Sequence, residues 1–404
     1  MRILHVSMLY PPHVMGGAER SVALLAEAQV AAGHEVIAAC TTPGPFVEEE
    51  RNGVRVFRMP HETRFWAEEW PKHNAFERLW RKAMMPFNKG LRRHFERVLD
   101  LVRPDIVHTH SMVDVSTSLW PAAAAKGYTV VHTLRDYDLL CVDGSMYHGG
   151  KGCGIKCQVL SAPKKQHHRH LSAVAAISHE AMHQHLEQKL FSTIPEQRRQ
   201  IIWNSAHLAG TGPNYRRPDR SREPFTFGYL GRVTDDKGIG VLIEAVRRLP
   251  ADVSCRVIVA GTSPVGLERF VAACAGLPIH FAGHSEPLPF FEGIDVLVVP
   301  SIWAEPFGRI IIEAYSAGVP VLASRAGGIP SLIAGDKDRW LIPPGDVHAL
   351  SDRMTAILRA GRDGLPPPSN FDVILEQTRL DTMVLRYAAF YDAALGHDQT
   401  QGAR

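Results

Sequence analysis

Two glutamates eight positions apart, Glu305 and Glu313, are the first residues whose type and spacing suggest chemistry. A buried strand is expected to end at Pro300 and a helix to begin near Gly308, so Glu305 would lie at the helix entrance and Glu313 inside the helix. The unpaired backbone amides of such a helix start form an anion site, and a glycine lets a ligand approach closely. Taken singly, each carboxylate also fits a structural role, one complementing the helix dipole and the other solvated.

A pair of cations is the second candidate. Arg232 and Lys237 lie five positions apart around an expected strand-to-helix turn, beside Gly231 and Gly238. Positioned cations of this kind stabilise negative charge on phosphate groups. Each residue alone is also typical of an exposed surface cation, but the neighbouring glycines favour phosphate binding.

Three cysteines and a histidine form a candidate metal site in a glycine-rich stretch. Cys141, Cys153 and Cys157, with His148 between them, offer the ligands that suit a tetrahedral Zn²⁺ ion. Such an ion would have a structural role, pinning the loop. The spacing differs from the usual Cys-x2-Cys knuckle, so unligated thiols are the alternative. The other cysteines lie in apolar segments typical of small buried hydrophobes: Cys40, Cys255 and Cys274.

The composition is that of a globular protein and limits the classes of function. The chain has 404 residues, 45% of them hydrophobic and 22% charged, which predicts two or three domains and excludes a disordered or coiled-coil chain. The formal net charge of +3 gives no argument for a nucleic-acid partner. No apolar run comes near the length of about 18 residues that a membrane span needs. The pair Pro11-Pro12 interrupts the first apolar segment too early for a signal peptide, so we expect a cytoplasmic protein.

Two series of strands alternate with helices and predict parallel sheets covered on both faces. The first series, within residues 1–206, has strands at 3–8, 34–40, 54–59, 105–110, 128–134 and 173–177. The second, within residues 224–373, has strands at 225–230, 254–260, 278–282, 295–300 and 319–323, after a linker at 207–223. We therefore expect an α/β chain with two doubly wound domains facing a central cleft, and a final helix at 374–395 that packs back on the first domain.

The helical stretch 76–102 is strongly basic, with a predicted break or kink at Pro86. Aromatic and aliphatic side chains are interleaved with its cations: Arg78, Arg81, Lys82, Lys89, Arg92, Arg93 and Arg97. One interpretation is a solvated basic face above a packed apolar face. The other is a basic amphipathic surface that touches anionic lipid.

The segment Glu305-Pro-Phe-Gly-Arg-Ile-Ile-Ile-Glu313 resembles the Glu-x7-Glu signature of the retaining glycosyltransferases of family 4. Three further segments resemble elements of that family in the same order: Gly16-Gly-Ala-Glu-Arg20, Phe227-Gly-Tyr-Leu-Gly-Arg-Val-Thr-Asp-Asp-Lys-Gly238, and Gly318-Val-Pro-Val with Gly327-Gly328. The resemblance runs from about residue 1 to 395. It implies the GT-B fold, two Rossmann-like domains with a nucleotide-sugar donor of UDP or GDP type in the cleft.

The resemblance also implies roles for individual residues. Arg232 and Lys237 would stabilise the leaving diphosphate, so that catalysis requires no metal. Glu313 would bind the ribose hydroxyls and Glu305 a hydroxyl of the donor sugar. The donor would also be contacted by the backbone amides of Phe307, Gly308, Gly16 and Gly17. Retention of configuration would follow front-face substitution, in which the leaving phosphate helps to deprotonate the acceptor.

Two residues depart from the family pattern. Arg135 stands where the family often has a histidine that reaches the donor sugar, and would act as a second cation near phosphate or near an anionic acceptor. Ser331 replaces a common glutamate, which puts one sugar or ribose contact in question. His110, at the end of a strand, either lines the acceptor side of the cleft or is a core histidine.

We therefore predict a retaining hexosyltransferase that moves a sugar from a nucleoside-diphosphate sugar to a glycan, lipid-linked or small-molecule acceptor. We expect this enzyme in the cytoplasm, and at the inner face of the membrane if the stretch 76–102 is the lipid-binding surface of the second interpretation. A nucleotide-sugar 2-epimerase of the same fold and a catalytically silent GT-B-like partner protein are the alternatives. No motif specifies the base, the sugar, the acceptor or the linkage.

Overall fold

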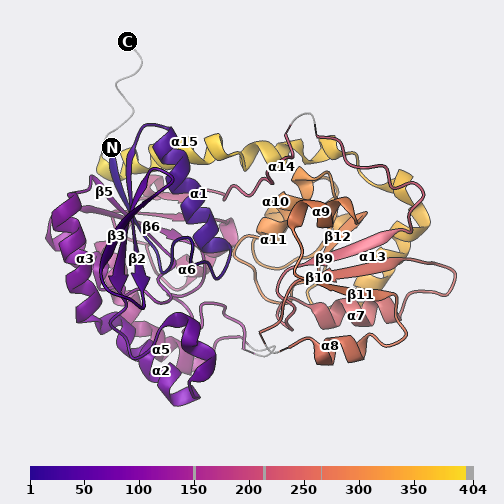
Figure 1. Ribbon diagram of the computed structural model, residues 1–404, viewed down its shortest axis with the longest axis horizontal. Helices are drawn as coiled ribbons and strands as arrows, with labels where there is room; N and C mark the ends of the chain where they lie inside the picture. The colour runs from indigo at the N-terminus through magenta and orange to yellow at the C-terminus, as the bar shows by residue number, and fades with distance from the viewer. Residues whose placement is uncertain (149–151, 213–214, 265, 397–404) are drawn as a thin grey trace, which may run out of the picture. The chain divides into compact units, whose positions relative to one another are not determined.

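The computed structural model describes residues 1–148, 152–212, 215–264 and 266–396 (Figure 1). Contacts within the chain divide it into two compact units. Unit 1 comprises residues 1–146, 153–204 and 380–404, and unit 2 comprises residues 147–152 and 205–379. Each unit is built on its own sheet with helices around it, which confirms the predicted fold class of two doubly wound α/β domains.

The sheet of unit 1 has the strand order β3-β4-β2-β1-β5-β6-β7-β8. Every neighbouring pair is parallel except β3 and β4, which are antiparallel. The strands are β1 (Arg2–Val6), β2 (Glu35–Thr42), β3 (Val47–Arg51), β4 (Val54–Pro60), β5 (Ile106–His110), β6 (Thr129–Leu134), β7 (Ala173–Ala176) and β8 (Arg199–Ile201). The central strands β1, β5 and β6 are buried at nearly every residue because both faces of the sheet are covered, even though β5 and β6 carry histidine and threonine side chains.

The helices of unit 1 connect these strands: α1 (Gly17–Ala31), α2 (Ala75–Met84), α3 (Lys89–Val102), α4 (Leu119–Ala125), α5 (Ile155–Lys165) and α6 (His179–Glu187). The predicted break at Pro86 is confirmed, because a short 3-10 turn at Met85–Phe87 separates α2 from α3. Asn88 then caps α3, its side chain accepting a hydrogen bond from the amide of Leu91. Further 3-10 turns cover Ala67–Lys72, Gln166–His170 and Glu196–Arg198.

The C-terminal helical stretch is two helices rather than one. α14 (Asp372–Gln377) belongs to unit 2, and α15 (Leu380–Leu395) belongs to unit 1. Thr378 follows α14, with its hydroxyl donating to the carbonyl of Ile374 at 2.8 Å. The buried side of α15 packs in one core cluster with β1, β5 and α1 through Met383, Tyr387, Phe390, Tyr391 and Ala394.

The sheet of unit 2 has the order β11-β10-β9-β12-β13-β14, with every neighbouring pair parallel. Its strands are β9 (Thr226–Leu230), β10 (Arg256–Ala260), β11 (Ile279–Gly283), β12 (Val296–Val299), β13 (Val321–Ser324) and β14 (Leu341–Ile342). Its other helices are α7 (Ile239–Arg247), α8 (Glu268–Ala273), α9 (Pro287–Glu292), α10 (Arg309–Ser316), α11 (Ile329–Leu332), α12 (Lys337–Trp340) and α13 (Val347–Ala360), with 3-10 turns at Arg362–Gly364 and Pro368–Phe371. The described part of the predicted linker, 207–212 and 215–223, holds no helix or strand.

Each sheet has a point where the strand order reverses. In unit 1 the chain adds strands outward from β1 and then returns to place β5 on the other side of β1. In unit 2 it returns in the same way to place β12 beside β9. Ligands of open α/β sheets bind at the carboxyl ends of the strands at such a point. In unit 2 these ends lead directly into Gly231 and Pro300.

Candidate active site

An ion pair between a partly buried lysine and a buried glutamate joins the two candidate segments of unit 2. The ammonium nitrogen of Lys237 lies 2.9 Å from a carboxylate oxygen of Glu305, and the same oxygen accepts a hydrogen bond from the hydroxyl of Ser301. Glu305 is only 8% exposed. Burial by itself would raise the pKa of Glu305, but the charge of Lys237 and the bond from Ser301 outweigh it and hold that pKa below its ordinary value. The carboxyl group is therefore ionised at neutral pH.

Close backbone packing fixes the loop that carries Glu305. The Ile302 amide donates to the carbonyl of Asp236 at 2.9 Å, and the Gly328 amide donates to the carbonyl of Glu305 at 2.7 Å. A Cβ on Gly238, which has φ +75°, would come within 1.8 Å of the Pro300 carbonyl oxygen. A Cβ on Gly327, at φ +57°, would come within 2.2 Å of the Glu305 carbonyl oxygen. Gly238 thus allows the loop after β12 to lie directly against the turn that presents Lys237, and Gly327 allows the segment between β13 and α11 to lie against the backbone of Glu305.

Arg232 lies at the same edge of the sheet and is much more open to solvent. Its side chain is 59% exposed, and its guanidinium is 3.7 Å from the carboxylate of Asp236. The hydroxyl of Tyr229 donates to the Arg232 carbonyl oxygen at 2.5 Å, which fixes the backbone while the side chain extends into solvent. A long exposed cation at the end of a central strand is suited to reach a phosphate group.

The start of α10 agrees with the sequence prediction. Gly308, at φ +105°, is the N-cap residue and offers no side chain to accept bonds from the first-turn amides. Phe307 before it is buried. Glu313 is partly buried, with a carboxylate oxygen 3.5 Å from the guanidinium of Arg309. The structure therefore places Glu305, Phe307, Gly308 and Glu313 along one loop and helix at the carboxyl end of β12.

In unit 1, the glycine loop forms the start of α1. The amide of Gly16, the N-cap residue, donates to the carboxylate of Glu19 at 2.9 Å, and Gly17 opens the helix. Glu19 is buried. The predicted contact of the Gly16 amide with a donor would therefore have to replace or share this internal hydrogen bond.

Arg135 is the central residue of a buried polar network in unit 1. Its Nε donates to Nδ1 of His110 at 3.1 Å and its Nη1 donates to the side-chain oxygen of Asn204 at 2.5 Å. Its Nη2 is buried and has no hydrogen-bond partner within the described chain. Burial lowers the pKa of Arg135 from its ordinary high value. One donor of this buried guanidinium is thus unsatisfied by the described residues.

His110 is fully buried, and both its ring nitrogens are in hydrogen bonds, Nδ1 with Arg135 and Nε2 with Nδ1 of His5 at 2.9 Å. The ring nitrogens of His108 contact the hydroxyls of Tyr391 and Thr133, each at 2.7 Å. Burial lowers the pKa of His5 to about 4 and holds that of His110 well below its ordinary value. Of the two roles left open for His110, this geometry favours the neutral core histidine.

Asp136, to which the sequence analysis gave no role, lies just beyond the carboxyl end of β6. Burial and the nearby charge of Asp138 raise the pKa of Asp136 to about 6, against a hydrogen bond from Ser111 that lowers it. Asp138 itself is buried and forms an ion pair with Lys164 of α5 at 2.5 Å. The position of Asp136 two residues after the end of a central strand was the signal that could have marked it.

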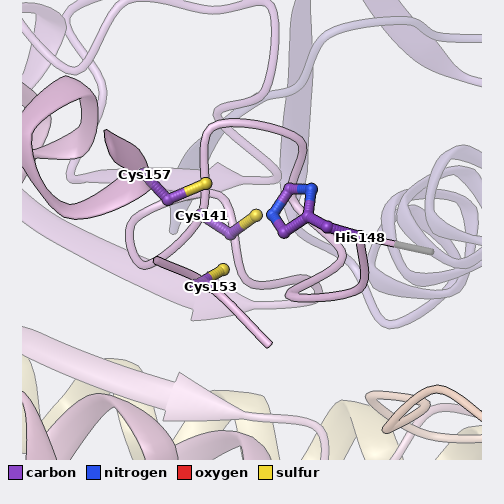
Figure 2. Close-up of side chains that lie close together, drawn as sticks. All are labelled: Cys141, His148, Cys153 and Cys157. Atoms are coloured by element: carbon purple, nitrogen blue, oxygen red, sulfur yellow. The ribbon is translucent and has the colours of Figure 1, made fainter. Parts of the chain in front are cut away.

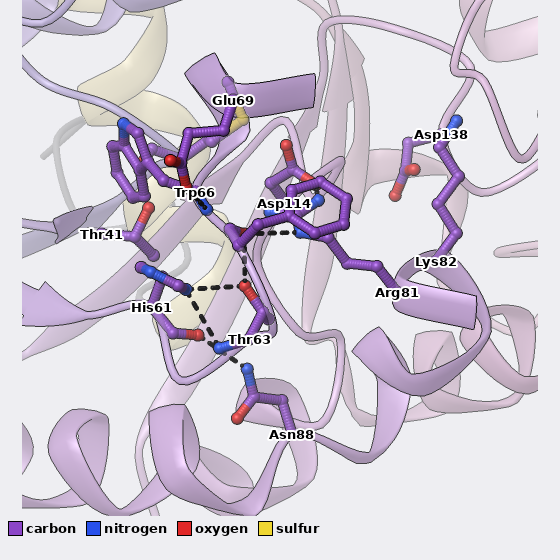
Figure 3. A network of polar contacts seen from close by, with 12 residues as sticks. Thr41, His61, Thr63, Trp66, Glu69, Arg81, Lys82, Asn88, Asp114 and Asp138 are labelled. Atoms are coloured by element: carbon purple, nitrogen blue, oxygen red, sulfur yellow. Dashed lines mark hydrogen bonds and ion pairs between the residues drawn. The ribbon is translucent and has the colours of Figure 1, made fainter. Parts of the chain in front are cut away.

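The basic stretch 76–102 divides into two helices with different faces. α3 buries Leu91, Phe95 and Val98 and exposes its cations, as the first interpretation predicts. In α2 this arrangement is reversed: the side chain of Arg81 is buried, pairs with Asp114 and donates to the Phe65 carbonyl at 3.1 Å (Figure 3). The exposed side chains on and just after α2 are apolar: Phe76 at 71%, Trp80 at 54%, Met84 at 46% and Phe87 at 52%.

Comparison with known proteins identifies a family model for each half of the chain. The family model for glycosyl transferases group 1 matches residues 224–360, and the model for the glycosyl transferase 4-like domain matches residues 16–203. Together the two matches span most of the chain.

Relatives and solved structures extend the comparison. An uncharacterised protein of the cps region of Klebsiella pneumoniae is 28% identical over 82% of this chain and 87% of its own length. A putative colanic acid biosynthesis glycosyltransferase, WcaL of Escherichia coli, is 30% identical over 34% of this chain and 37% of its own. The structure of Anabaena HepE in complex with UDP matches 97% of this chain and 100% of that chain with a TM-score of 0.71 at 16% identity, which shows the shared fold.

No helix in the described ranges is long and apolar enough to cross a membrane. The two sheets, the positions of the Lys237–Glu305 pair and of the glycine loop, and the two family models lead to one assignment. The chain belongs to the glycosyltransferases of the GT-B fold, with a family 4-like first half and a group 1 second half.

Proposed function

We propose that the chain transfers a sugar from a nucleoside-diphosphate sugar to a glycan or lipid-linked acceptor, with retention of configuration and without a catalytic metal. The observation that carries the proposal is the Lys237–Glu305 pair at the carboxyl ends of the neighbouring strands β9 and β12. It places a cation and an ionised carboxylate at the point of the sheet where ligands bind. The UDP bound by the Anabaena neighbour supports a nucleotide-sugar donor.

The donor groups are assigned by charge. The diphosphate gains negative charge as the glycosidic bond breaks, and Lys237 with the exposed Arg232 would neutralise it. Glu305, held ionised, would accept a hydrogen bond from a hydroxyl of the sugar, and Glu313 would accept from the ribose hydroxyls. The uncapped amides at Gly308 would meet the sugar or phosphate.

Retention would follow front-face substitution. The bond between the anomeric carbon and the donor phosphate oxygen breaks, the bond to the acceptor oxygen forms on the same face, and the acceptor proton passes to the leaving phosphate. The unpartnered Nη2 of Arg135 would bind an anionic group of donor or acceptor. Arg135 would then be the second cation that the sequence analysis predicts, held by the buried network of His110 and Asn204.

The surface around α2 supports a membrane-associated acceptor. Phe76, Trp80, Met84 and Phe87 expose an apolar stripe, and the exposed Lys72 and Lys89 lie in the chain on either side of it. The buried contacts of Arg81 (Figure 3) fix the inner face of α2. The apolar side chains are therefore left exposed to solvent. An apolar face flanked by cations binds anionic bilayers.

Two experiments test the proposal. The first follows hydrolysis or transfer from UDP- and GDP-sugars by proton NMR, without and with Mg²⁺ or Mn²⁺. We expect a product with the donor's own anomeric configuration and no requirement for added metal. This activity should be lost in Lys237→Ala and Glu305→Ala and kept in Arg359→Ala, a control at an exposed residue. An inverted anomer contradicts retention, a sugar epimerised without transfer supports the epimerase, and unchanged rates in both site variants contradict the site.

The second experiment measures sedimentation with vesicles of phosphatidylglycerol and phosphatidylcholine. Phe76→Ser with Trp80→Ser should release the protein from these vesicles, whereas Val373→Ser with Leu385→Ser, which alters side chains equally exposed elsewhere, should not. Equal binding by both double variants, or no binding by the unaltered protein, would contradict the membrane contact.

A further inference from the structure

Three cysteine thiols and one histidine imidazole lie close together in the loop between β6 and α5 and in the first turn of α5. The ligand atoms of Cys141, His148, Cys153 and Cys157 all lie within 4.8 Å of one another. Figure 2 shows the three sulfur atoms and the His148 ring gathered around one point, although Cys141, His148 and Cys153 come from separate parts of the loop and Cys157 comes from the first turn of α5. No disulfide joins any of the six cysteines.

The ligand set identifies the ion. Three sulfurs and one nitrogen form a closed tetrahedral set of the kind that holds structural Zn²⁺, with no position left for a substrate or water. Zinc–sulfur bonds of about 2.3 Å place the sulfurs of a tetrahedral site about 3.8 Å apart, so the observed cluster needs only a small contraction. Lys165 lies close enough to Cys153 to interact with it electrostatically, and its charge would offset the net charge of −1 on a zinc ion with three thiolates.

The alternative explanations account for fewer of the residues. Cys141 and Cys157 also pack in a small apolar cluster with Val142, so buried thiols alone would explain these two. That cluster does not explain why His148 points its ring toward the sulfurs (Figure 2). A disulfide could join only two of the three cysteines and would leave the third thiol and the imidazole unexplained.

The loop has a structural need for such a link. Between Leu134 and Ile155, the described residues form no helix and no strand segment longer than a single bridge. Local hydrogen bonds fold its beginning, where the Cys141 amide donates to the Tyr137 carbonyl and the Tyr137 amide to the Gly144 carbonyl, at 2.8 and 3.0 Å. The two ends of the loop are joined by the buried pair of Asp138 and Lys164. An ion bound by Cys141 and Cys157 would join the same two ends a second time.

We propose that Cys141, His148, Cys153 and Cys157 bind one structural Zn²⁺ ion that fixes the loop following Arg135 and Asp136 at the carboxyl end of β6. The ion takes no part in the transfer reaction. It holds the connection into α5 and, through Asp138, the position of the neighbouring residues. This site is independent of the donor chemistry proposed for unit 2.

The metal content of the full chain tests this directly. Protein purified from zinc-supplemented culture should contain one zinc per chain by atomic spectroscopy. Cys153→Ala, which alters a partly exposed ligand, should lose it, whereas Cys274→Ala, a cysteine outside the cluster, should keep it. Chelation should lower Tm by about 5 °C in the unaltered protein and in Cys274→Ala, but not in Cys153→Ala.

Cobalt replacement keeps the proposal testable if a variant fails to fold. The unaltered chain loaded with Co²⁺ should show the visible bands of tetrahedral cobalt and a near-ultraviolet thiolate-to-cobalt band. His148→Ala should alter the visible bands and keep the thiolate band, because three sulfurs remain. A folded protein with less than about a tenth of an equivalent of zinc and no thiolate-to-cobalt band would overturn the proposal, whatever its activity on sugar donors.

Discussion

Removing Lys237 should destabilise the protein in a way that depends on pH. At an effective dielectric constant of about 20, unit charges separated by the 2.9 Å between Lys237 and Glu305 attract by roughly 6 kcal/mol. Desolvation of the 8%-exposed Glu305 and solvent screening of Lys237 offset more than half of this. We therefore expect Lys237→Ala to lower the free energy of unfolding by about 2–3 kcal/mol at pH 7.

The sign of the pH dependence follows from the pKa of Glu305. In the unaltered protein this pKa lies below its ordinary value, so the carboxylate contributes stability above the unfolded-state pKa of about 4.3 and loses it as the pH falls through the folded value. Without Lys237, burial should raise the pKa of Glu305 above the unfolded value. The variant then carries a cost at neutral pH that is relieved as the carboxyl group is protonated.

Urea unfolding at pH 7 and pH 4 measures this difference. The stability gap between the unaltered protein and Lys237→Ala should shrink from about 2–3 kcal/mol at pH 7 to about 1 kcal/mol at pH 4. In a Glu305→Gln background, Lys237→Ala should cost less than about 1 kcal/mol at both pH values. An equal gap at the two pH values, or an undiminished cost in the Glu305→Gln background, would refute the role given to the pair.

Three further predictions concern stability. Gly238→Ala should lower the free energy of unfolding, measured with urea, by about 3 kcal/mol or more, because the new Cβ would clash with the Pro300 carbonyl. The control Gly276→Ala has a similar φ of +76° but open space around it and should cost only about 1 kcal/mol. Equal costs for the two variants would contradict the packing argument. Asp136→Asn should stabilise the protein by about 1–2 kcal/mol at pH 8 and by much less at pH 4.5. The reason is that the pKa of Asp136, raised to about 6, makes its ionised form increasingly unfavourable in the folded protein as the pH rises. An effect on Tm that does not depend on pH would contradict this. Tyr391→Phe should cost about 1–2 kcal/mol, because its hydroxyl contacts the buried His108 and Gln29, whereas removing the exposed hydroxyl of Ser192 should leave the urea midpoint unchanged.

The elements that the sequence predicted best are those with a local signal. Strand ends, the break at Pro86 and the start of a helix at Gly308 each follow from apolar runs, a proline or a glycine in the chain. The short strands β3, β8 and β14 carry no such signal and were not predicted. The single C-terminal helix was wrong, because the apolar period continues across Thr378 although the two halves pack in different units.

Parts of the candidate site depend on contacts between distant residues. The sequence singled out Lys237 and Glu305 separately, and their ion pair appears only in the structure, where the neighbouring strands β9 and β12 bring the two segments together. The network of His110 could not be predicted either, because His5 reaches it from another strand and Tyr391 of α15 contacts its neighbour His108. The inward turn of Arg81 depends likewise on Asp114, which no local pattern links to α2.

Binding of a nucleotide-sugar donor at the Lys237–Glu305 pair is the central claim. Thermal shift of the zinc-loaded protein against a panel of UDP- and GDP-sugars, in buffer without Mg²⁺ or Mn²⁺, tests it most directly. We expect a rise in Tm with donors of one base, which should be abolished in Lys237→Ala and retained in Arg359→Ala. No shift with any donor, or an equal shift in folded Lys237→Ala, would contradict it.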